Sequence, residues 1–178
     1  MRMIKIIKIL FKKILFFLAS TRKRAELYKK EGVRMGKNCE VFAKVSFGSE
    51  PYLVQLGDHV KITYGSSFVT HDGGVYVLRN MGLAKNADKF APIHVGNNVF
   101  FGIKCIIMPG VTIGDNVIIG SGSIVTRDIP SNSVAAGVPC RVLKSIESYY
   151  ETCKDNLDDT KHMNTVEKKK YLYNKYNI

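Results

Sequence analysis

A strict six-residue spacing of apolar residues runs through the second half of the 178-residue chain. The apolar anchors of this spacing are Val95, Phe101, Ile107, Ile113, Ile119 and Val125. A second small or apolar residue stands four positions after each anchor, at Val99, Cys105, Val111, Val117, Ser123 and Ile129. An α-helix repeats every 3.6 residues and a strand every two, so neither element alone produces this period. The pattern therefore indicates an internal structural repeat.

The same spacing extends upstream in two shorter runs: Met35, Val41 and Phe47, then Leu56, Ile62 and Phe68. Three six-residue units per turn would form a triangular coil, with each anchor stacked on the anchor three units away. We therefore expect roughly four coils, at residues 35–52, 56–73, 95–112 and 113–130. The glycines that follow four of the anchors fit tight corners, where a side chain would crowd the turn; they are Gly96, Gly102, Gly114 and Gly120.

The extent of the repeat and the break within it divide the chain into predicted parts. Residues 74–92 break the six-residue phase and are rich in glycine, asparagine and proline, which predicts a loop extruded from one corner and suited to binding. We expect an amphipathic N-terminal helical segment over 1–30, a β-helix domain over 31–143 with the 74–92 insertion, and a helical tail over 144–178. The stretch 131–141 is expected to be extended.

The net charge of +12 is confined to one end of the chain. Residues 1–44 carry 13 Lys and Arg against 3 acidic residues, whereas residues 45–143 and 144–178 each carry 7 against 6. The predicted β-helix is therefore close to neutral, and we expect no nucleic-acid partner. The lysine-rich tail is interpreted as a solvated or capping helix.

Residues 1–18 predict a cationic amphipathic helix, with Lys5, Lys8 and Lys12 on one face and Ile, Leu and Phe on the other. The longest uncharged run, Ile14 to Ser20, is too short to cross a bilayer, and no secretory cleavage site follows it. Such a helix suits an anionic membrane surface, or else packing against the protein body or a subunit interface. We expect a cytoplasmic protein, with peripheral association to the inner face of the membrane as the membrane-bound alternative.

The four cysteines, Cys39, Cys105, Cys140 and Cys153, are scattered and form no Cys/His spacing suited to a zinc site. We expect reduced thiols and no bound metal.

Residues 92–143 resemble the hexapeptide-repeat acyltransferases, in particular the maltose and galactoside O-acetyltransferase group. The resemblance rests on the segments VGNNV (95–99), MPGVTIGDN (108–116), IGSGSIVTRDIP (119–130) and AGVPCRV (136–142). It implies a mainly β fold, a left-handed parallel β-helix, with acetyl-CoA as co-substrate. It also implies a homotrimer with active sites in the clefts between subunits.

Acetyl transfer to a hydroxyl needs a base, because an alcohol is a weak nucleophile until it loses its proton. His71 lies just before the 74–92 insertion and coincides with the catalytic histidine of that family, so it is the expected general base. Asp72 or Asp58 is expected to orient its imidazole, and the sequence does not decide between them. His59 and His94 are expected to be surface or corner residues.

The resemblance also carries the acetyl-CoA contacts onto this chain. It places Ser121, Thr126, Arg127 and Arg141 against the cofactor, with Phe100, Gly102 and Ile103 lining the groove for the pantetheine arm. Arginines suit the phosphates of CoA. The chain departs from the family in having Phe100 in place of a frequent Trp, Ile103 in place of a small or polar residue, Ser121 in place of Ala, and Arg127 in place of Lys.

The acceptor side is distinct, since the 74–92 insertion with Arg79, Asn80 and Asn86 replaces the acceptor-binding parts of the galactoside enzymes. The predicted function is O-acetylation of a sugar hydroxyl, on a surface-polysaccharide or lipid-linked glycan precursor. Two alternatives stay open: N-acetylation of an amino sugar or antibiotic, and a structural β-helix scaffold without activity.

Overall fold

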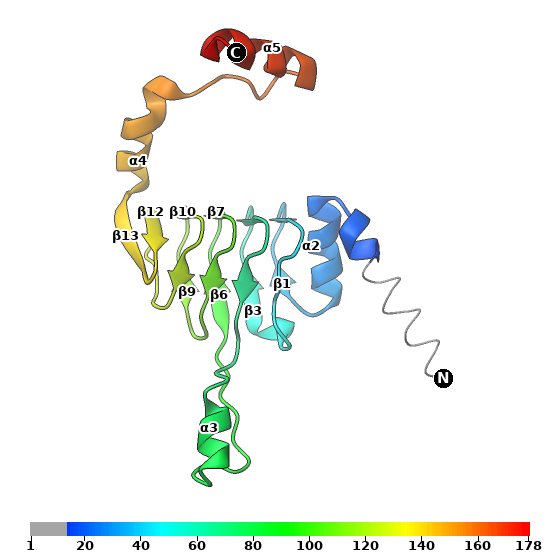
Figure 1. Ribbon diagram of the computed structural model, residues 1–178, viewed down its shortest axis with the longest axis vertical. Helices are drawn as coiled ribbons and strands as arrows, with labels where there is room; N and C mark the ends of the chain where they lie inside the picture. Colours follow the sequence, from blue (N-terminus) through cyan, green and yellow to red (C-terminus); the bar gives the residue numbers. More distant parts are fainter. Residues whose placement is uncertain (1–13) are drawn as a thin grey trace.

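The structure is a computed structural model that describes residues 14–178, and its body is a parallel β-helix (Figure 1). The described strands run parallel in three sheets, ordered β1-β3-β6-β9, β2-β4-β7-β10-β12 and β5-β8-β11, where β12 is Ser133–Gly137. The last strand, β13 (Cys140–Ser145), pairs antiparallel with β12. The strands of the coils are β1 (Arg34–Met35), β2 (Glu40–Val41), β3 (Val54–Leu56), β4 (Lys61–Ile62), β5 (Ser67–Phe68), β6 (Ile93–Val95), β7 (Val99–Phe101), β8 (Ile106–Ile107), β9 (Thr112–Ile113), β10 (Val117–Ile119) and β11 (Ile124–Val125).

The predicted column of anchors is confirmed. Val95 pairs with Ile113 in one sheet, Phe101 pairs with Ile119 in the second, and Val125 lies over Ile107 in the third. Each of these side chains is buried, as are the residues four positions after the anchors. The apolar core is therefore a continuous column along the axis of the helix.

The corners of the coils are made in a different way from the one expected. The left-handed backbone conformation falls three residues after the anchors, at Asn98 (φ 55°), Lys104 (57°) and Asn116 (55°), and not at the glycine directly after each anchor. That glycine is required by the neighbouring coil, because a Cβ on Gly102 would lie 2.7 Å from the Cα of Ser121. The crowding predicted for the glycines therefore arises between coils.

Helix α2 (Thr21–Lys30) covers the N-terminal end of the column. Its Arg24 is buried, and the guanidinium donates hydrogen bonds to the carbonyl oxygens of Phe16 (2.9 Å), Ala19 (2.6 Å) and Val41 (2.9 Å). This side chain joins a helical turn at 14–18 to α2 and to the first coil. Most of the predicted amphipathic helix, residues 1–13, lies outside the described residues.

A hairpin and two helices follow the last coil. Strands β12 (Ser133–Gly137) and β13 (Cys140–Ser145) form the hairpin, so the helical tail predicted from residue 144 begins two residues later. It consists of α4 (Ile146–Cys153), the 3₁₀ turn η2 (Lys154–Asn156) and α5 (Thr165–Tyr176). In Figure 1 this tail rises away from the coils. All four cysteines are free thiols.

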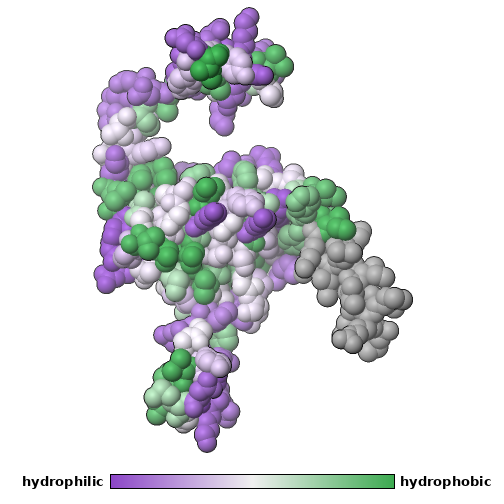
Figure 2. Space-filling view, viewed as in Figure 1, coloured by the Kyte–Doolittle hydropathy of each residue, from purple (hydrophilic) through white to green (hydrophobic). Residues whose placement is uncertain are grey.

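The 74–92 insertion projects from the coils as a finger, residues 72–90, that contains the short helix α3 (Val75–Asn80) (Figure 1). The base of the finger is closed by backbone hydrogen bonds from Asp72 N to Lys89 O (2.8 Å) and from Ala91 N to Thr70 O (2.9 Å). In Figure 2 the finger carries apolar side chains on one side and polar ones on the other. Its two limbs therefore leave and rejoin the body at one corner.

Among residues 14–178, no helix combines the length and the apolar character needed to cross a membrane.

The close approach of coils predicts that Gly57→Ala destabilises the fold. The added Cβ would lie 2.6 Å from Gly96 O and 2.7 Å from Gly96 C, both backbone atoms that cannot move aside without shifting a coil. We expect the free energy of unfolding to fall by about 2 kcal/mol, measured by urea titration. Gly73→Ala is the matched control, because its Cβ would meet nothing within 4 Å. Equal losses in the two variants would contradict the explanation.

Candidate active site

His71 lies at the base of the finger, shortly after strand β5, which is the second coil's strand in the third sheet. Its backbone forms an isolated antiparallel bridge with Phe90 at the other limb of the finger. The side chain is 44% exposed, and its Nδ1 lies 3.1 Å from the Oε2 of Glu50. The imidazole is therefore held at Nδ1 while the side chain stays partly open to solvent.

Glu50 precedes the 3₁₀ turn η1 (Pro51–Leu53) of the first coil. The first two coils are offset by 21 residues, as the pairing of Met35 with Leu56 shows, and the same separation joins Glu50 to His71. Coil stacking itself therefore places this carboxylate beside the imidazole.

The Glu50 carboxylate is ionised and fixed by several donors. The Ser49 hydroxyl, followed by the side chains of Thr70 and His71, holds the pKa of Glu50 below its usual value. The Thr70 hydroxyl donates to the same Oε2 at 3.0 Å. An ionised carboxylate beside Nδ1 favours the tautomer with the proton on Nδ1, which leaves the Nε2 lone pair free to accept a proton.

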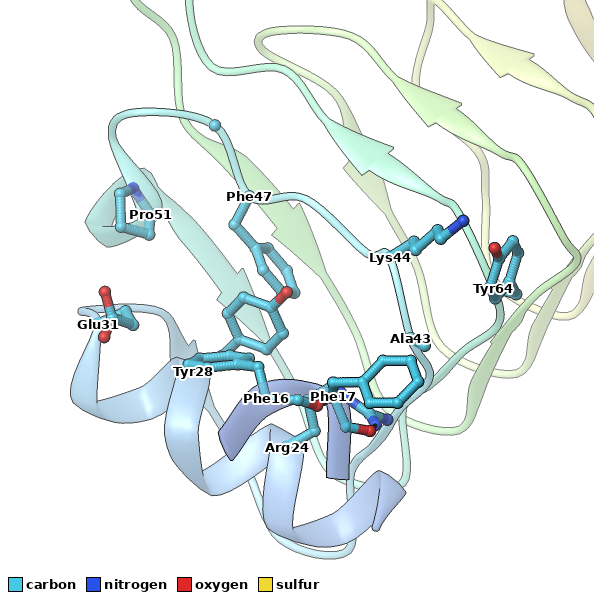
Figure 3. Close-up of a pocket in the computed structure, with 11 residues that line it drawn as sticks. Phe16, Phe17, Arg24, Tyr28, Glu31, Ala43, Lys44, Phe47, Pro51 and Tyr64 are labelled. Carbon is cyan, nitrogen blue, oxygen red and sulfur yellow. Dashed lines mark hydrogen bonds between the residues drawn. The ribbon is translucent and has the colours of Figure 1, made fainter. Parts of the chain in front are cut away.

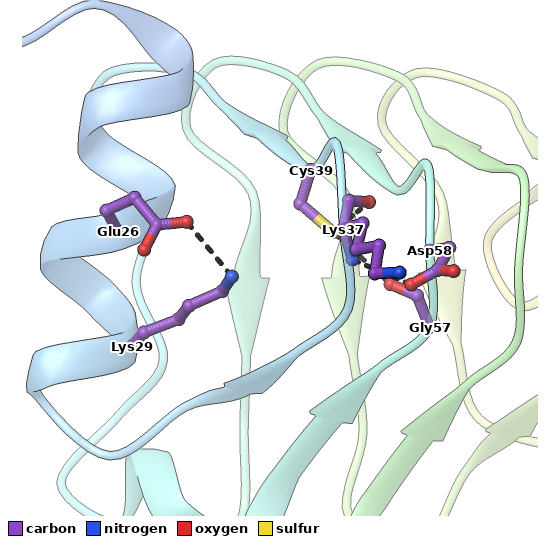
Figure 4. A network of polar contacts seen from close by, with 6 residues as sticks. All are labelled: Glu26, Lys29, Lys37, Cys39, Gly57 and Asp58. Atoms are coloured by element: carbon purple, nitrogen blue, oxygen red, sulfur yellow. Dashed lines mark hydrogen bonds and ion pairs between the residues drawn. The ribbon is translucent and has the colours of Figure 1, made fainter.

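The carboxylate partner of His71 is thus neither Asp72 nor Asp58, the two residues that the sequence analysis considered. Asp72 accepts hydrogen bonds from Lys89 Nζ (3.1 Å) and Gly74 N (2.9 Å), and the Lys89 ammonium is the main reason that its pKa lies below the usual value. Asp58 accepts a hydrogen bond from Lys37 N (2.7 Å) at a different corner (Figure 4). Both carboxylates therefore stabilise local structure and do not contact the imidazole.

Sequence reasoning missed Glu50, although the chain carries a signal for it. The sequence separation between successive anchors, which is six elsewhere in the coils outside the 74–92 insertion, rises to nine between Phe47 and Leu56. The three extra residues let the chain bulge at this corner, and Glu50 lies within that bulge.

His71 and Glu50 open onto a cleft of about 340 Å³ at the base of the finger. The cleft is lined by Ser49, Glu50, His71, Asp72, Gly73, Arg79, Asp88, Lys89 and Phe90. Its side chains therefore come from the first coil, the second coil and both limbs of the finger.

The residues expected to bind acetyl-CoA fall into three places. Gly102, Ile103 and Ser121 meet at one corner of adjacent coils, where Ile103 N donates to the Ser121 hydroxyl at 3.1 Å. Thr126 and Arg127 follow β11, at the corner that ends the third sheet.

Arg141 lies on β13, and Phe100 lies on the second sheet. The tip of the hairpin is tied to the corner of Ser121, because Gly137 N donates to the Ser123 hydroxyl at 3.1 Å. Phe100 instead faces a separate hollow beneath α4 and shares its lining with Tyr149 and Tyr150. The structure thus brings the hairpin that carries Arg141 to the corner of Ser121 and places Phe100 on another face of the coil.

A larger, mainly apolar cavity of about 770 Å³ lies at the N-terminal end of the β-helix (Figure 3). Phe16, Phe17, Tyr28 and Phe47 point into it, and it shares no lining residue with the His71 cleft. It holds no histidine or cysteine, so the chemistry expected of this chain does not reside there.

Within the described part of the chain, no group of three or more His, Cys, Asp or Glu side chains is arranged to hold a metal ion.

Comparison with known proteins places this architecture in a family. The family description "Bacterial transferase hexapeptide (six repeats)" matches residues 92–127. Protein CapG of Staphylococcus aureus is 46% identical over 167 residues, which cover 93% of this chain and 96% of that protein.

Two solved structures resemble this chain in fold and sequence. A maltose O-acetyltransferase from Clostridium difficile 630 aligns with a TM-score of 0.54 and 30% identity, over 70% of this chain and 75% of its own. A galactoside acetyltransferase in complex with coenzyme A aligns with a TM-score of 0.51 and 34% identity, over 80% and 82%. The coils described above therefore form a left-handed parallel β-helix, as the sequence predicted.

Proposed function

The chain belongs to the hexapeptide-repeat family of bacterial transferases, and from that premise we propose that it acetylates a sugar hydroxyl bound in the His71 cleft. Acetyl-CoA is the donor, in keeping with the relatives and with their coenzyme A complex. The observation that carries the proposal is the Glu50–His71 pair, with Nδ1 held at 3.1 Å and both residues lining the cleft.

In this mechanism Nε2 of His71 removes the proton from the acceptor hydroxyl while the oxygen attacks the thioester carbonyl. The tetrahedral intermediate then collapses, the carbon–sulfur bond breaks, and the imidazolium returns the proton to the CoA sulfur. Glu50 stabilises the imidazolium that exists between these steps and keeps the ring oriented. No net proton is gained or lost.

The proposed donor site runs from the corner of Thr126 and Arg127 toward His71. Strands β5, β8 and β11 are successive neighbours in the third sheet, so these two ends lie about 10 Å apart along the axis. Ser121, Gly102 and Ile103 form the adjoining corner, and Arg127 and Arg141 supply cations for the phosphates of CoA. Phe100 lies on the second sheet, so it contacts the pantetheine arm only if the bound acetyl-CoA extends onto that sheet.

We propose a homotrimer, with the corner of Ser121 at the boundary between copies. Three exposed apolar side chains lie at this corner or on the hairpin tied to it, namely Ile103 (50% exposed), Val138 (68%) and Leu143 (62%). A solvent-facing group of this kind favours contact with another protein surface.

The proposed acceptor is a precursor of a surface glycan, handled at the inner face of the membrane. The excess of cationic residues in 1–44 supports this location, because basic segments are attracted to anionic lipid headgroups. Acetylation of an amine uses the same base and differs only in acceptor, whereas a scaffold without activity predicts no dependence on His71.

His71→Ala should lower the acceptor-dependent release of CoA thiol by at least about a hundredfold, because the general base is lost. The assay supplies acetyl-CoA with a panel of sugars and amino sugars, and mass spectrometry distinguishes O-acetyl from N-acetyl products. His94→Ala is the control, since His94 lies on β6 outside the cleft. Equal rates for His71→Ala and the unmodified protein would contradict the assignment.

Glu50→Gln should lower kcat by at least about tenfold while leaving KM for acetyl-CoA unchanged, because the amide no longer stabilises the imidazolium. Asp58→Asn, which alters a carboxylate engaged with a backbone amide at another corner, serves as the control. A kcat for Glu50→Gln equal to that of the control would remove Glu50 from the mechanism.

The proposed membrane contact predicts that the full chain floats with vesicles containing anionic lipid and that a variant lacking residues 1–18 does not. Raising the salt concentration should weaken the binding, because the attraction is electrostatic. Neutral vesicles are the control. Failure of the full chain to float on the anionic vesicles would instead favour packing of this segment on the protein body or at a subunit interface.

A further inference from the structure

Two ion pairs cross-link the limbs of the finger beside the His71 cleft. Lys89 Nζ lies 3.1 Å from Asp72 Oδ2, and Arg79 Nη1 lies 2.6 Å from Asp88 Oδ1. Arg79 Nη1 also donates to Ala87 O at 2.7 Å. Both pairs join residues that are far apart in the finger, so they hold its limbs in one relative position.

These pairs also determine the charge that a ligand meets. Arg79 and Lys89 are the cationic side chains among the residues lining the cleft, and each is already neutralised by a carboxylate of the finger. Glu50 adds a third carboxylate, ionised and adjacent to the base. The lining therefore holds three anions and two paired cations, and a ligand anion placed there meets net repulsion.

Phe90 supplies an apolar surface in the same cleft. Its side chain is 50% exposed, and its ring centroid lies 6.3 Å from that of His71, with 70° between the ring planes. The backbone bridge between the two residues fixes this arrangement. An exposed aromatic face beside a base suits the apolar C–H face of a sugar ring, because stacking there leaves the ring hydroxyls pointing outward, toward the base and the carboxylates.

From these features we propose that the cleft selects an uncharged pyranose ring, stacked on Phe90, and discriminates against sugars that carry a carboxylate. The inference rests on the proposed function and adds the class of acceptor to it. The carboxylates of Asp72 and Asp88 each have further lone pairs with which to accept hydrogen bonds from sugar hydroxyls, whereas a uronate has no unpaired cation to meet among the described lining residues.

The test compares matched probes: methyl glucoside and methyl galactoside, each against its uronate, which differs only in the carboxylate at C6. Binding to the full-length protein is measured by saturation-transfer NMR and by titration, in the presence of CoA. We expect the neutral probes to bind roughly tenfold more tightly than the uronates, from repulsion across a partly hydrated cleft. Equal or tighter binding of the uronates would overturn the proposal.

Two substitutions assign the effect to named residues. Phe90→Ala should weaken binding of the neutral probes by about threefold to tenfold, and Phe90→Tyr should restore it, because the ring is what binds. Asp88→Asn should free Arg79 and improve uronate binding relative to the neutral probe by a similar factor, about threefold to tenfold. Asp155→Asn, in η2 and away from the cleft, is the charge-matched control. An unchanged probe ratio in Asp88→Asn, or an unchanged affinity in Phe90→Ala, would contradict the inference.

Failure of the proposed function gives a different result. If no sugar causes thiol release but the neutral probes still bind preferentially in a Phe90-dependent manner, the acetyl-transfer proposal fails and the selectivity proposal stands. If sugars are acetylated with no preference between neutral and acidic rings, the reverse holds.

Discussion

The structure depends on a single constraint, which is that no coil can bury its own apolar side chains. Each strand of a coil turns only one or two side chains inward, and only the coils above and below complete their burial. The ends of the column must therefore be covered. At the N-terminal end an aromatic series continues the column outward, from Phe101 through Phe68 and Phe47 to Tyr28 of α2, with ring centroids 4.7–5.4 Å apart. At the other end the β12–β13 hairpin extends the second sheet.

The same stacking creates the candidate site. A strict coil has no room for functional groups in its core, whereas an interruption of the repeat lets the chain leave the coil and enclose a cleft. Two interruptions lie on successive coils, the bulge containing Glu50 and the finger that starts after His71. Because the coils are in register, these interruptions are superposed, and the carboxylate of one meets the imidazole of the other. The pair is thus a product of the fold's periodicity as much as of the residues themselves.

This origin explains what the sequence could and could not predict. The six-residue period predicted the apolar column, the coils and the position of the finger. It could do so because equally spaced anchors imply similar coils stacked along one axis. The partner of His71 could not be found by adjacency, since Asp72 is the neighbour in sequence but points to Lys89. Finding Glu50 requires the offset between the first two coils, and the bulge changes that offset from the usual period of 18 to 21. The corner residues with left-handed backbone, such as Asn98, likewise depend on three-dimensional geometry.

The closed base of the finger has a consequence for how such a protein can diversify. The chain leaves the body after Thr70 and returns at Ala91, and the two points are joined by a hydrogen bond of 2.9 Å. The coils on either side therefore need nothing from the length or composition of the excursion between them. Loop closure costs grow slowly with loop length, so excursions of different size are tolerated at this seam. A lineage can exchange the finger, and with it one side of the proposed acceptor cleft, while the corners of the coils stay as they are.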